Sequence, residues 1–247
     1  MQVEILNGRR LKWDHLANAR DLGGYPTLAG GRMRFRAFVR SDTLSNLTEA
    51  GTQALLAYGV RLIVDLRYPQ EVAERPNPLA QHPSVRYHHL SLLDPAQREE
   101  ETRLFARDRV AWHFFVLEQR REAIACVMRL FIEAPEGGVL FHCFVGKDRT
   151  GLVAALLLDL ADVPHEVIAA DYHASEHYLH TLHQQWLSTF EDPEMRARMA
   201  ALTTCPPEVM LQVLDELEAR YGGAYGYLRE AGLDEAEVRA LRARLLA

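Results

Sequence analysis

Short apolar strands alternate with helical segments along the first two thirds of the chain, and this alternation limits the possible folds more than any other feature. Residues 60–66 (VRLIVDL) and 139–142 (VLFH) have the length and apolar character of buried strands. Further strand candidates are residues 32–40 and 84–94, and the segments with helical spacing are residues 47–59, 99–133 and 150–161. Strands that alternate with helices predict an α/β domain, with a central, mainly parallel sheet flanked by helices.

The chain from residue 164 onward has the pattern of helices alone. We expect residues 164–230 to pack on or over the α/β core, as a helical insertion or lid region and not as an independent domain. The last segment begins with Asp234 and Glu237, which have the spacing of a capping box, and this helix should close the fold. The 247 residues therefore predict a single domain, residues 1–247.

Charge and composition exclude several functional classes. The net charge of −6 argues against general nucleic-acid binding, which requires a basic face. The N-terminal residues lack the pattern of a signal peptide, and the longest apolar run, near residues 152–160, is too short for a membrane span. The three cysteines are too few for a disulfide scaffold, and Cys126, within an apolar helical stretch, should be buried. We therefore expect a cytoplasmic protein, with leaderless secretion as the alternative.

The segment FHCFVGKDRTG, residues 141–151, connects a predicted strand to a predicted helix. Amide groups of such a loop and of the first helical turn point into one concavity, where they bind an anion with the help of the helix dipole. Arg149 can offer two parallel N–H donors to a phosphate, and Gly146 permits a backbone turn that a side chain would obstruct. The loop therefore predicts a phosphate site.

A cysteine lies in the middle of this predicted phosphate site. A helix N-terminus and a nearby cation favour the thiolate form, so we expect Cys143 to be a nucleophile at neutral pH. Five residues separate Cys143 from Arg149. A loop of that length can surround three phosphate oxygens and leave the fourth, the leaving oxygen, facing outward. This arrangement suits the cleavage of phosphate esters.

The segment HCFVGKDRTG resembles the signature loop of the protein-tyrosine-phosphatase superfamily, His-Cys-x5-Arg-Ser/Thr. Its GKDRTG form is similar to a bacterial branch of tyrosine and dual-specificity phosphatases that includes enzymes acting on phosphoinositides. A second segment, NARDLGGYPT at residues 18–27, resembles a segment near the N-termini of that branch. The resemblance implies the cysteine-phosphatase fold and a chemistry that needs no cofactor and no metal.

The resemblance also implies roles for individual residues. Cys143 would be the nucleophile, Arg149 would bind the phosphate and stabilise the transition state, and Thr150 would donate its hydroxyl to the thiolate. His142 would organise the loop. The phosphate-binding backbone would come from six consecutive residues: Phe144, Val145, Gly146, Lys147, Asp148 and Arg149.

The sequence offers three candidates for the general acid that protonates the leaving oxygen. Asp148, within the loop, is the first candidate. Asp65 is the second, because it ends a predicted parallel strand at the edge where α/β sheets bind ligands, and Arg67 shares that edge. Asp94, the third, has a turn or capping carboxylate as its alternative.

Arg20 and Asp21 lie within the second motif, and we expect them to form an ion pair that braces the signature loop. The alternative is an ordinary turn. His173, His177 and His180 share one face of a predicted helix, but no carboxylate or cysteine accompanies them, so we expect a solvated helix face and no metal site.

The sequence thus predicts a phosphomonoester hydrolase that forms a cysteinyl-phosphate intermediate, most simply a protein-tyrosine phosphatase. Its partners would be a phosphorylated protein or a phosphoinositide, with inorganic phosphate as product. One alternative is a dual- or broad-specificity phosphatase active on phosphoinositides. Lys147 favours it, because we expect this side chain to reach outward to the charge of a polyanionic headgroup. An alternative of another class is a phosphate-binding pseudophosphatase.

Overall fold

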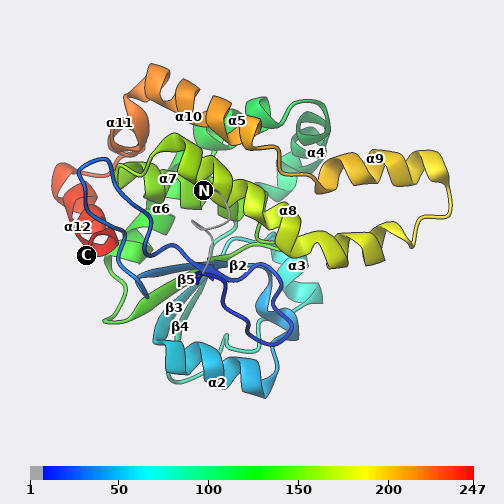
Figure 1. Cartoon of the computed structure of the whole chain (residues 1–247), viewed down its shortest axis with the longest axis horizontal. Helices are drawn as coiled ribbons and strands as arrows, with labels where there is room; N and C mark the ends of the chain where they lie inside the picture. The colour runs from blue at the N-terminus through cyan, green and yellow to red at the C-terminus, as the bar shows by residue number, and fades with distance from the viewer. Residues whose placement is uncertain (1–7) are drawn as a thin grey trace.

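A five-stranded sheet forms the centre of the protein, as the computed structural model, which describes residues 8–247, shows (Figure 1). The strands are β1 (Arg20–Asp21), β2 (Phe38–Ser41), β3 (Val60–Asp65), β4 (Arg86–His89) and β5 (Gly138–His142), in the spatial order β1-β2-β5-β3-β4. All neighbouring strands are parallel except β1 and β2. The predicted α/β fold with a mainly parallel sheet is therefore confirmed.

The strand register brings the carboxyl ends of the central strands to one edge. His142, the last residue of β5, lies opposite Ser41 of β2 and Asp65 of β3. The chain continues from this edge directly into the predicted signature loop. In open α/β sheets, ligands bind outside the carboxyl ends of the strands, so the topology alone makes this edge the expected site.

Both faces of the sheet are buried, which explains why the central strands are apolar runs without alternation. Along β5, Val139 and Phe141 join the larger apolar core, which contains side chains of α6, α7, α8 and α10 to α12. Leu140 joins a second core on the opposite face, with Leu55 of α2. In Figure 1 these two layers lie above and below the sheet.

The helices follow the predicted segments closely. They are α2 (Glu49–Tyr58), α3 (Pro69–Glu74), α4 (Arg98–Arg107), α5 (Arg109–Gln119), α6 (Arg121–Ile132), α7 (Asp148–Leu160), α8 (His165–Leu187), α9 (Pro193–Thr203), α10 (Pro207–Tyr221), α11 (Gly223–Glu230) and α12 (Glu235–Leu245), with two short 3-10 helices, η1 (Leu44–Asn46) and η2 (Pro95–Gln97). The predicted C-cap at Gly59 has φ 104°, a left-handed conformation that glycine adopts without strain.

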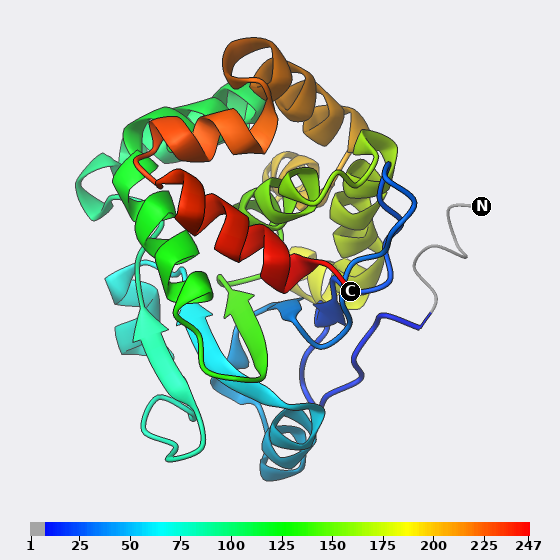
Figure 2. The same ribbon diagram turned by 90° about the vertical axis from the view of Figure 1, so that its left-hand side faces the viewer.

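The last helix closes the fold as expected. Its capping box is formed by Asp234 and Glu237, whose side chains accept hydrogen bonds from each other's backbone amides at 2.7 and 2.8 Å. The backbone of Leu246 pairs with Met33, so the end of the chain lies beside the segment that leads into β2. Figure 2 shows α12 lying beside α6 on the same face of the sheet.

Two local predictions need correction. Only the last part of the segment 32–40 is a strand, because its first half turns away to pair with the loop at Pro26 and with the C-terminus. Cys126 is exposed, because it lies on the outer side of α6 while its neighbours Ala125 and Val127 face the core. A helix that packs on the core with one face leaves the residues of its other face exposed, even where the sequence is apolar.

The C-terminal helices pack on the α/β core, with α8 running between α7 and α10. The end of α8 and all of α9 form a hairpin that extends beyond the rest of the molecule in Figure 1. We refer to residues 179–203 as the α8–α9 hairpin. None of the helices in the described part of the chain combines the length and hydropathy required to cross a membrane.

Candidate active site

The signature loop, residues 143–149, runs from the end of β5 into the first residues of α7. Cys143 is 1% exposed, at the bottom of the loop. Gly146 has φ 69°, and a Cβ atom there would lie 2.3 Å from the carbonyl oxygen of Ser41. No other residue fits here, because the backbone conformation and the close contact with β2 both require a residue without a side chain.

The carbonyl groups of the loop are held from behind by two side chains. Asn18 donates its amide N–H groups to the carbonyl oxygens of Val145 and Gly146, at 3.0 and 2.9 Å. Arg40, on β2, donates to the carbonyl oxygens of Gly146 and Lys147, at 2.8 and 3.2 Å. Because these carbonyl oxygens are bonded at the back, the amide groups of the loop are free to face the other side, where an anion can bind.

Behind these contacts lies a buried ionic cluster, which we call the back cluster: Arg20, Arg40 and Asp171. Asp171, on α8, accepts from Nε of Arg20 at 2.8 Å and from Nη1 of Arg40 at 2.5 Å, and all three side chains are 1% exposed or less. Burial by itself would raise the pKa of Asp171, but the two guanidinium groups hold it far below its usual range. Arg20 also donates to Asn18 Oδ1 at 2.6 Å, so the cluster fixes the residue that holds the loop.

The expected ion pair between Arg20 and Asp21 does not form. Asp21 instead accepts from the backbone amides of Gly23 and Arg36 at 2.6 and 2.8 Å, and from the hydroxyl of Tyr58. The two residues are consecutive in β1, and consecutive side chains of a strand point to opposite faces. Arg20 does brace the loop, through Asn18 and Asp171, and Asp21 does not take part.

On the front of the loop, Cys143 and Arg149 line the same cavity, of about 190 Å³, which we call the small cavity. The guanidinium group of Arg149 is held by Glu71 of α3 in a bidentate ion pair, with distances of 2.6 and 3.0 Å. Burial by itself would lower the pKa of Arg149, but the charges of Cys143 and Glu71 raise it. Tyr68 also lines the cavity, with its ring centroid 5.3 Å from the guanidinium carbon.

His142 and Thr150 lie at the two ends of the loop. His142 is fully buried, its Nδ1 lies 2.9 Å from the carbonyl oxygen of Cys143, and its Nε2 lies 3.6 Å from Asp65 Oδ2. Burial lowers the pKa of His142, and the charge of Asp65 opposes this shift. The Oγ1 atom of Thr150 is buried and has no hydrogen-bond partner within residues 8–247.

Asp65 and Arg67 support the site from a distance. Asp65 is fully buried, and its carboxylate accepts from Arg67 at 2.6 Å and from the hydroxyl of Tyr87 at 2.9 Å. Burial by itself would raise the pKa of Asp65, but His142 and Arg67 lower it. Asp65 does not line the small cavity. Its expected role as a proton donor is therefore not supported, because a donor has to reach the leaving group.

Asp94 is a capping residue, the alternative stated for it above. Its side chain accepts from the backbone amide of Ala96 at 2.9 Å at the start of η2, and it lies 3.4 Å from Arg120.

Arg67 donates at 2.8 Å to the carbonyl oxygen of Arg75, just after α3. It thereby connects Asp65 to the helix that carries Glu71.

Asp148 is the one acid candidate that lines the small cavity. The hydroxyl of Tyr172, on α8, donates to Asp148 Oδ1 at 2.9 Å. Lys147 Nζ lies 3.7 Å from the other carboxylate oxygen. The carboxylate is thus oriented by α8 at the rim of the small cavity.

Lys147 does not reach outward, contrary to our expectation. Its side chain is 3% exposed, and Nζ donates to the carbonyl oxygens of Leu202 and Thr204, at 2.5 and 3.3 Å. These carbonyls lie at the C-terminal end of α9, where the helix dipole favours a cation. Lys147 therefore joins the signature loop to the α8–α9 hairpin.

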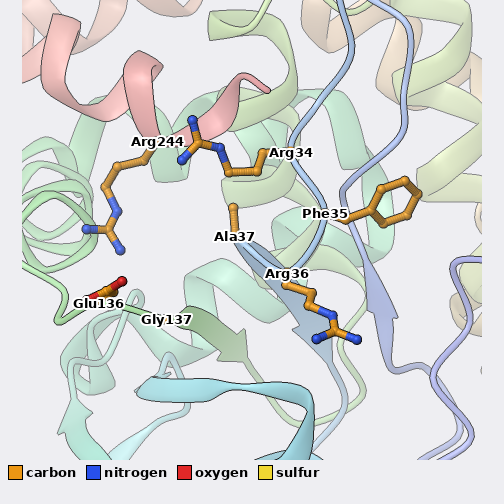
Figure 3. A pocket seen from close by; sticks show the side chains of 7 residues that line it. All are labelled: Arg34, Phe35, Arg36, Ala37, Glu136, Gly137 and Arg244. Atoms are coloured by element: carbon orange, nitrogen blue, oxygen red, sulfur yellow. The ribbon is translucent and has the colours of Figure 1, made fainter.

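Two further cavities differ in their relation to the loop. One, of about 780 Å³, lies between the loop and the α8–α9 hairpin, and we call it the large cavity. The other, of about 290 Å³, is lined by Arg34, Ala37, Gly137 and Arg244 (Figure 3). Since Ala37 and Gly137 precede β2 and β5, this cavity lies at the end of the sheet opposite to the signature loop and is not part of the site.

No metal site accompanies the loop within residues 8–247, because no three His, Cys, Asp or Glu side chains there are arranged to hold an ion. His173, of the histidine face on α8, has its Nδ1 2.8 Å from the carbonyl oxygen of Cys205. It therefore helps to position the turn that follows α9.

The tyrosine phosphatase family matches residues 11–247, which include the Asn18 motif, the signature loop and the C-terminal helices. The chain belongs to the tyrosine phosphatase family. It is thereby a phosphatase, and its similarity to the bacterial members predicted from HCFVGKDRTG is confirmed.

Two bacterial relatives are similar over most of their length. The chain is 34% identical to a tyrosine-protein phosphatase of Nostoc commune, over 85% of this chain and 74% of that protein. It is 30% identical to the triple specificity protein phosphatase PtpB of Mycobacterium tuberculosis, over 93% of this chain and 96% of that protein. Among solved structures, TpbA of P. aeruginosa covers 84% of this chain and is covered over 85% of its own length, at 20% identity and a TM-score of 0.35.

Proposed function

We propose that this phosphatase hydrolyses phosphotyrosine in proteins through a cysteinyl-phosphate intermediate on Cys143. The observation that carries the proposal is that Cys143 and Arg149 line one cavity, at the carboxyl edge of a parallel sheet and at the N-terminus of α7. The loop amides and the guanidinium group would bind the phosphate oxygens. The thiolate would then lie directly behind the phosphorus atom.

The reaction would have two steps. In the first, the Cys143 sulfur forms a bond to phosphorus while the bond from phosphorus to the tyrosine oxygen breaks, and Asp148 gives its proton to that oxygen. In the second, water attacks the phosphorus, Asp148 takes a proton from it, and the sulfur leaves as thiolate. Inorganic phosphate is the product, and the residues return to their initial states.

Arg149 would stabilise the negative charge on the equatorial oxygens of the transition state. Glu71 holds both terminal nitrogens of this guanidinium, which limits its rotation. Asp148 is favoured as the acid because it lines the small cavity and because Tyr172 orients it, whereas Asp65 and Asp94 are engaged elsewhere. Thr150, with its free buried hydroxyl, would stabilise the thiolate as it departs in the second step.

Two alternatives have different support. The similarity to a triple specificity phosphatase supports a broader substrate range, which could include phosphoinositides. The structural argument for that alternative, an outward cation at Lys147, does not hold because the ammonium group is bound to α9. A pseudophosphatase is disfavoured, since Cys143, Arg149 and Asp148 all line the same cavity.

Steady-state assays with p-nitrophenyl phosphate and a phosphotyrosine peptide test the proposal. The wild type should hydrolyse both, and Cys143→Ser should abolish turnover but still bind phosphate, because the amides and Arg149 remain. A phosphorylated Cys143, trapped by rapid acid quench and located by mass spectrometry, would identify the intermediate. Turnover by the serine variant at more than a trace level would contradict the role of Cys143.

A further inference from the structure

The large cavity has a mainly apolar wall that the mechanism above does not use. This wall is formed by Leu179, Leu182 and Trp186 of α8, Leu202 of α9 and Leu16. The cavity of about 780 Å³ is within the range of typical ligand sites. It is far larger than a phosphate needs, so its contents would be another part of the substrate.

Two of these side chains are unusually exposed for their size. Leu182 is 46% exposed and Trp186 is 43% exposed, and both lie on the side of α8 that faces the signature loop across the cavity. Single exposed apolar residues are normal on protein surfaces, but a group of them around a hollow indicates binding. Their position beside the catalytic loop gives this group a functional context.

The two cavities adjoin along the rim of the signature loop. Val145 and Asp148 line both of them, whereas Cys143 and Arg149 line only the small one. A phosphate bound over Cys143 would therefore place its tyrosine ring next to Val145 and Asp148. The residues flanking that tyrosine would then lie at the entrance of the large cavity.

The charges of the lining favour a peptide over a phosphoinositide. Lys147 is engaged by carbonyl groups at the C-terminal end of α9. Among the described residues that line the cavity, the other Arg or Lys is Arg75, an exposed side chain whose guanidinium group lies over the ring of Phe144. A headgroup with additional phosphates requires clustered arginines or lysines, and this lining does not provide them.

We propose that the large cavity binds an apolar segment of a phosphoprotein substrate that directly flanks the phosphotyrosine. This inference rests on the proposed function and adds a sequence preference to it. The preference would come from burial of a leucine-sized side chain of the substrate against Leu182 and Trp186. The apolar surfaces of these two residues are in contact with water when the cavity holds no substrate.

Two phosphotyrosine peptides test this proposal, identical except that the residues on both sides of the phosphotyrosine are leucine in one and serine in the other. The wild type should prefer the leucine peptide in kcat/KM by roughly tenfold, mainly through KM. The double variant Leu182→Ser/Trp186→Ala should bring this ratio close to one. The ratio is the readout because a general change in activity affects both peptides equally.

The matched control is Leu28→Ser, which removes an apolar side chain that is 77% exposed and lines neither cavity. It should keep the wild-type ratio. Equal kcat/KM for the two peptides in the wild type, or the same loss of preference in Leu28→Ser, would overturn the proposal.

A third substrate separates a lipid from a peptide as occupant. If the double variant keeps its peptide preference but loses activity on vesicles that contain a phosphorylated phosphatidylinositol, the cavity binds lipid and the proposal is wrong. A wild type that hydrolyses neither peptide nor p-nitrophenyl phosphate would refute the proposed function itself. The two kinds of failure are thus distinguishable.

Discussion

Arginine side chains lie on both sides of the signature loop, and their surroundings differ. At the back, Arg20 and Arg40 are 0% and 1% exposed and share Asp171, with further bonds to the loop and to Asn18. At the front, the Arg149 side chain is 12% exposed, pairs with Glu71 and lines the small cavity. The back cluster uses its donors within the protein, whereas Arg149 faces a space that an anion can enter.

Buried charges therefore have two separate roles around the signature loop. Buried guanidinium groups that share a carboxylate hold the loop in shape, and their loss should appear as a loss of stability. A guanidinium group that faces a cavity can bind a transition state, and its loss should appear as a loss of rate. The following changes should separate the two effects.

Asp171→Ala should have the largest effect on stability. It leaves two buried guanidinium groups without their carboxylate, which should lower the free energy of unfolding by about 3–5 kcal/mol. Urea denaturation followed by circular dichroism measures this change. A loss below about 1 kcal/mol would show that the back cluster is not a structural support.

The same variant gives a pH test. The pKa of Asp171 is lowered in the folded state, so its stabilising contribution is complete above the unfolded value of about 4 and decreases as the pH falls below it. The difference in stability between wild type and Asp171→Ala should therefore be constant from pH 7 to 5 and smaller at pH 3. A difference that grows on acidification would contradict the assigned sign.

Arg149→Lys should have the largest effect on rate after loss of the nucleophile. A lysine cannot present two parallel donors to a phosphate, so kcat/KM for p-nitrophenyl phosphate should fall by roughly 10²–10³-fold. The urea midpoint should change little compared with Asp171→Ala. A near-normal kcat/KM would remove Arg149 from its assigned role.

Asp148→Asn should affect substrates according to their leaving groups. For aryl phosphates whose phenol has a high pKa, kcat/KM should fall by about 10²-fold, and for strongly activated esters it should fall much less. The measurement is a series of aryl phosphates with wild type, variant and Asp65→Asn as the comparison. Parallel slopes for wild type and Asp148→Asn would show that another group is the acid.

Glu71→Gln should have the smallest effect of the four, a decrease of about tenfold in kcat/KM. A glutamine keeps one hydrogen bond to Arg149 but loses the charge and the second acceptor, and charged hydrogen bonds are worth roughly 1.5–3 kcal/mol. Glu71→Ala should reduce kcat/KM further. If both variants were as active as the wild type, Arg149 would need no orientation by α3.

The α/β architecture, the signature loop and the fold-closing helix could be predicted because each depends on neighbours in the sequence. The apolar residues of β3 and β5 are consecutive, the Cys143 to Arg149 spacing is local, and Asp234 and Glu237 cap a helix three residues apart. Local order of this kind is set by hydrophobic periodicity and capping chemistry. The family follows from the same residues, and the match over residues 11–247 confirms it.

The side chains that surround the loop could not be predicted from the sequence, because they come from elements that meet only on folding. Asn18, Arg40, Glu71 and Asp171 lie far from it in the chain, and of these only Asn18 was within a motif that the sequence singled out. Sequence spacing also could not show that Arg20 points to Asp171, or that Lys147 points to the end of α9. The direction of a side chain depends on the strand or helix that carries it and on the elements packed against it, and those elements meet only in the folded chain.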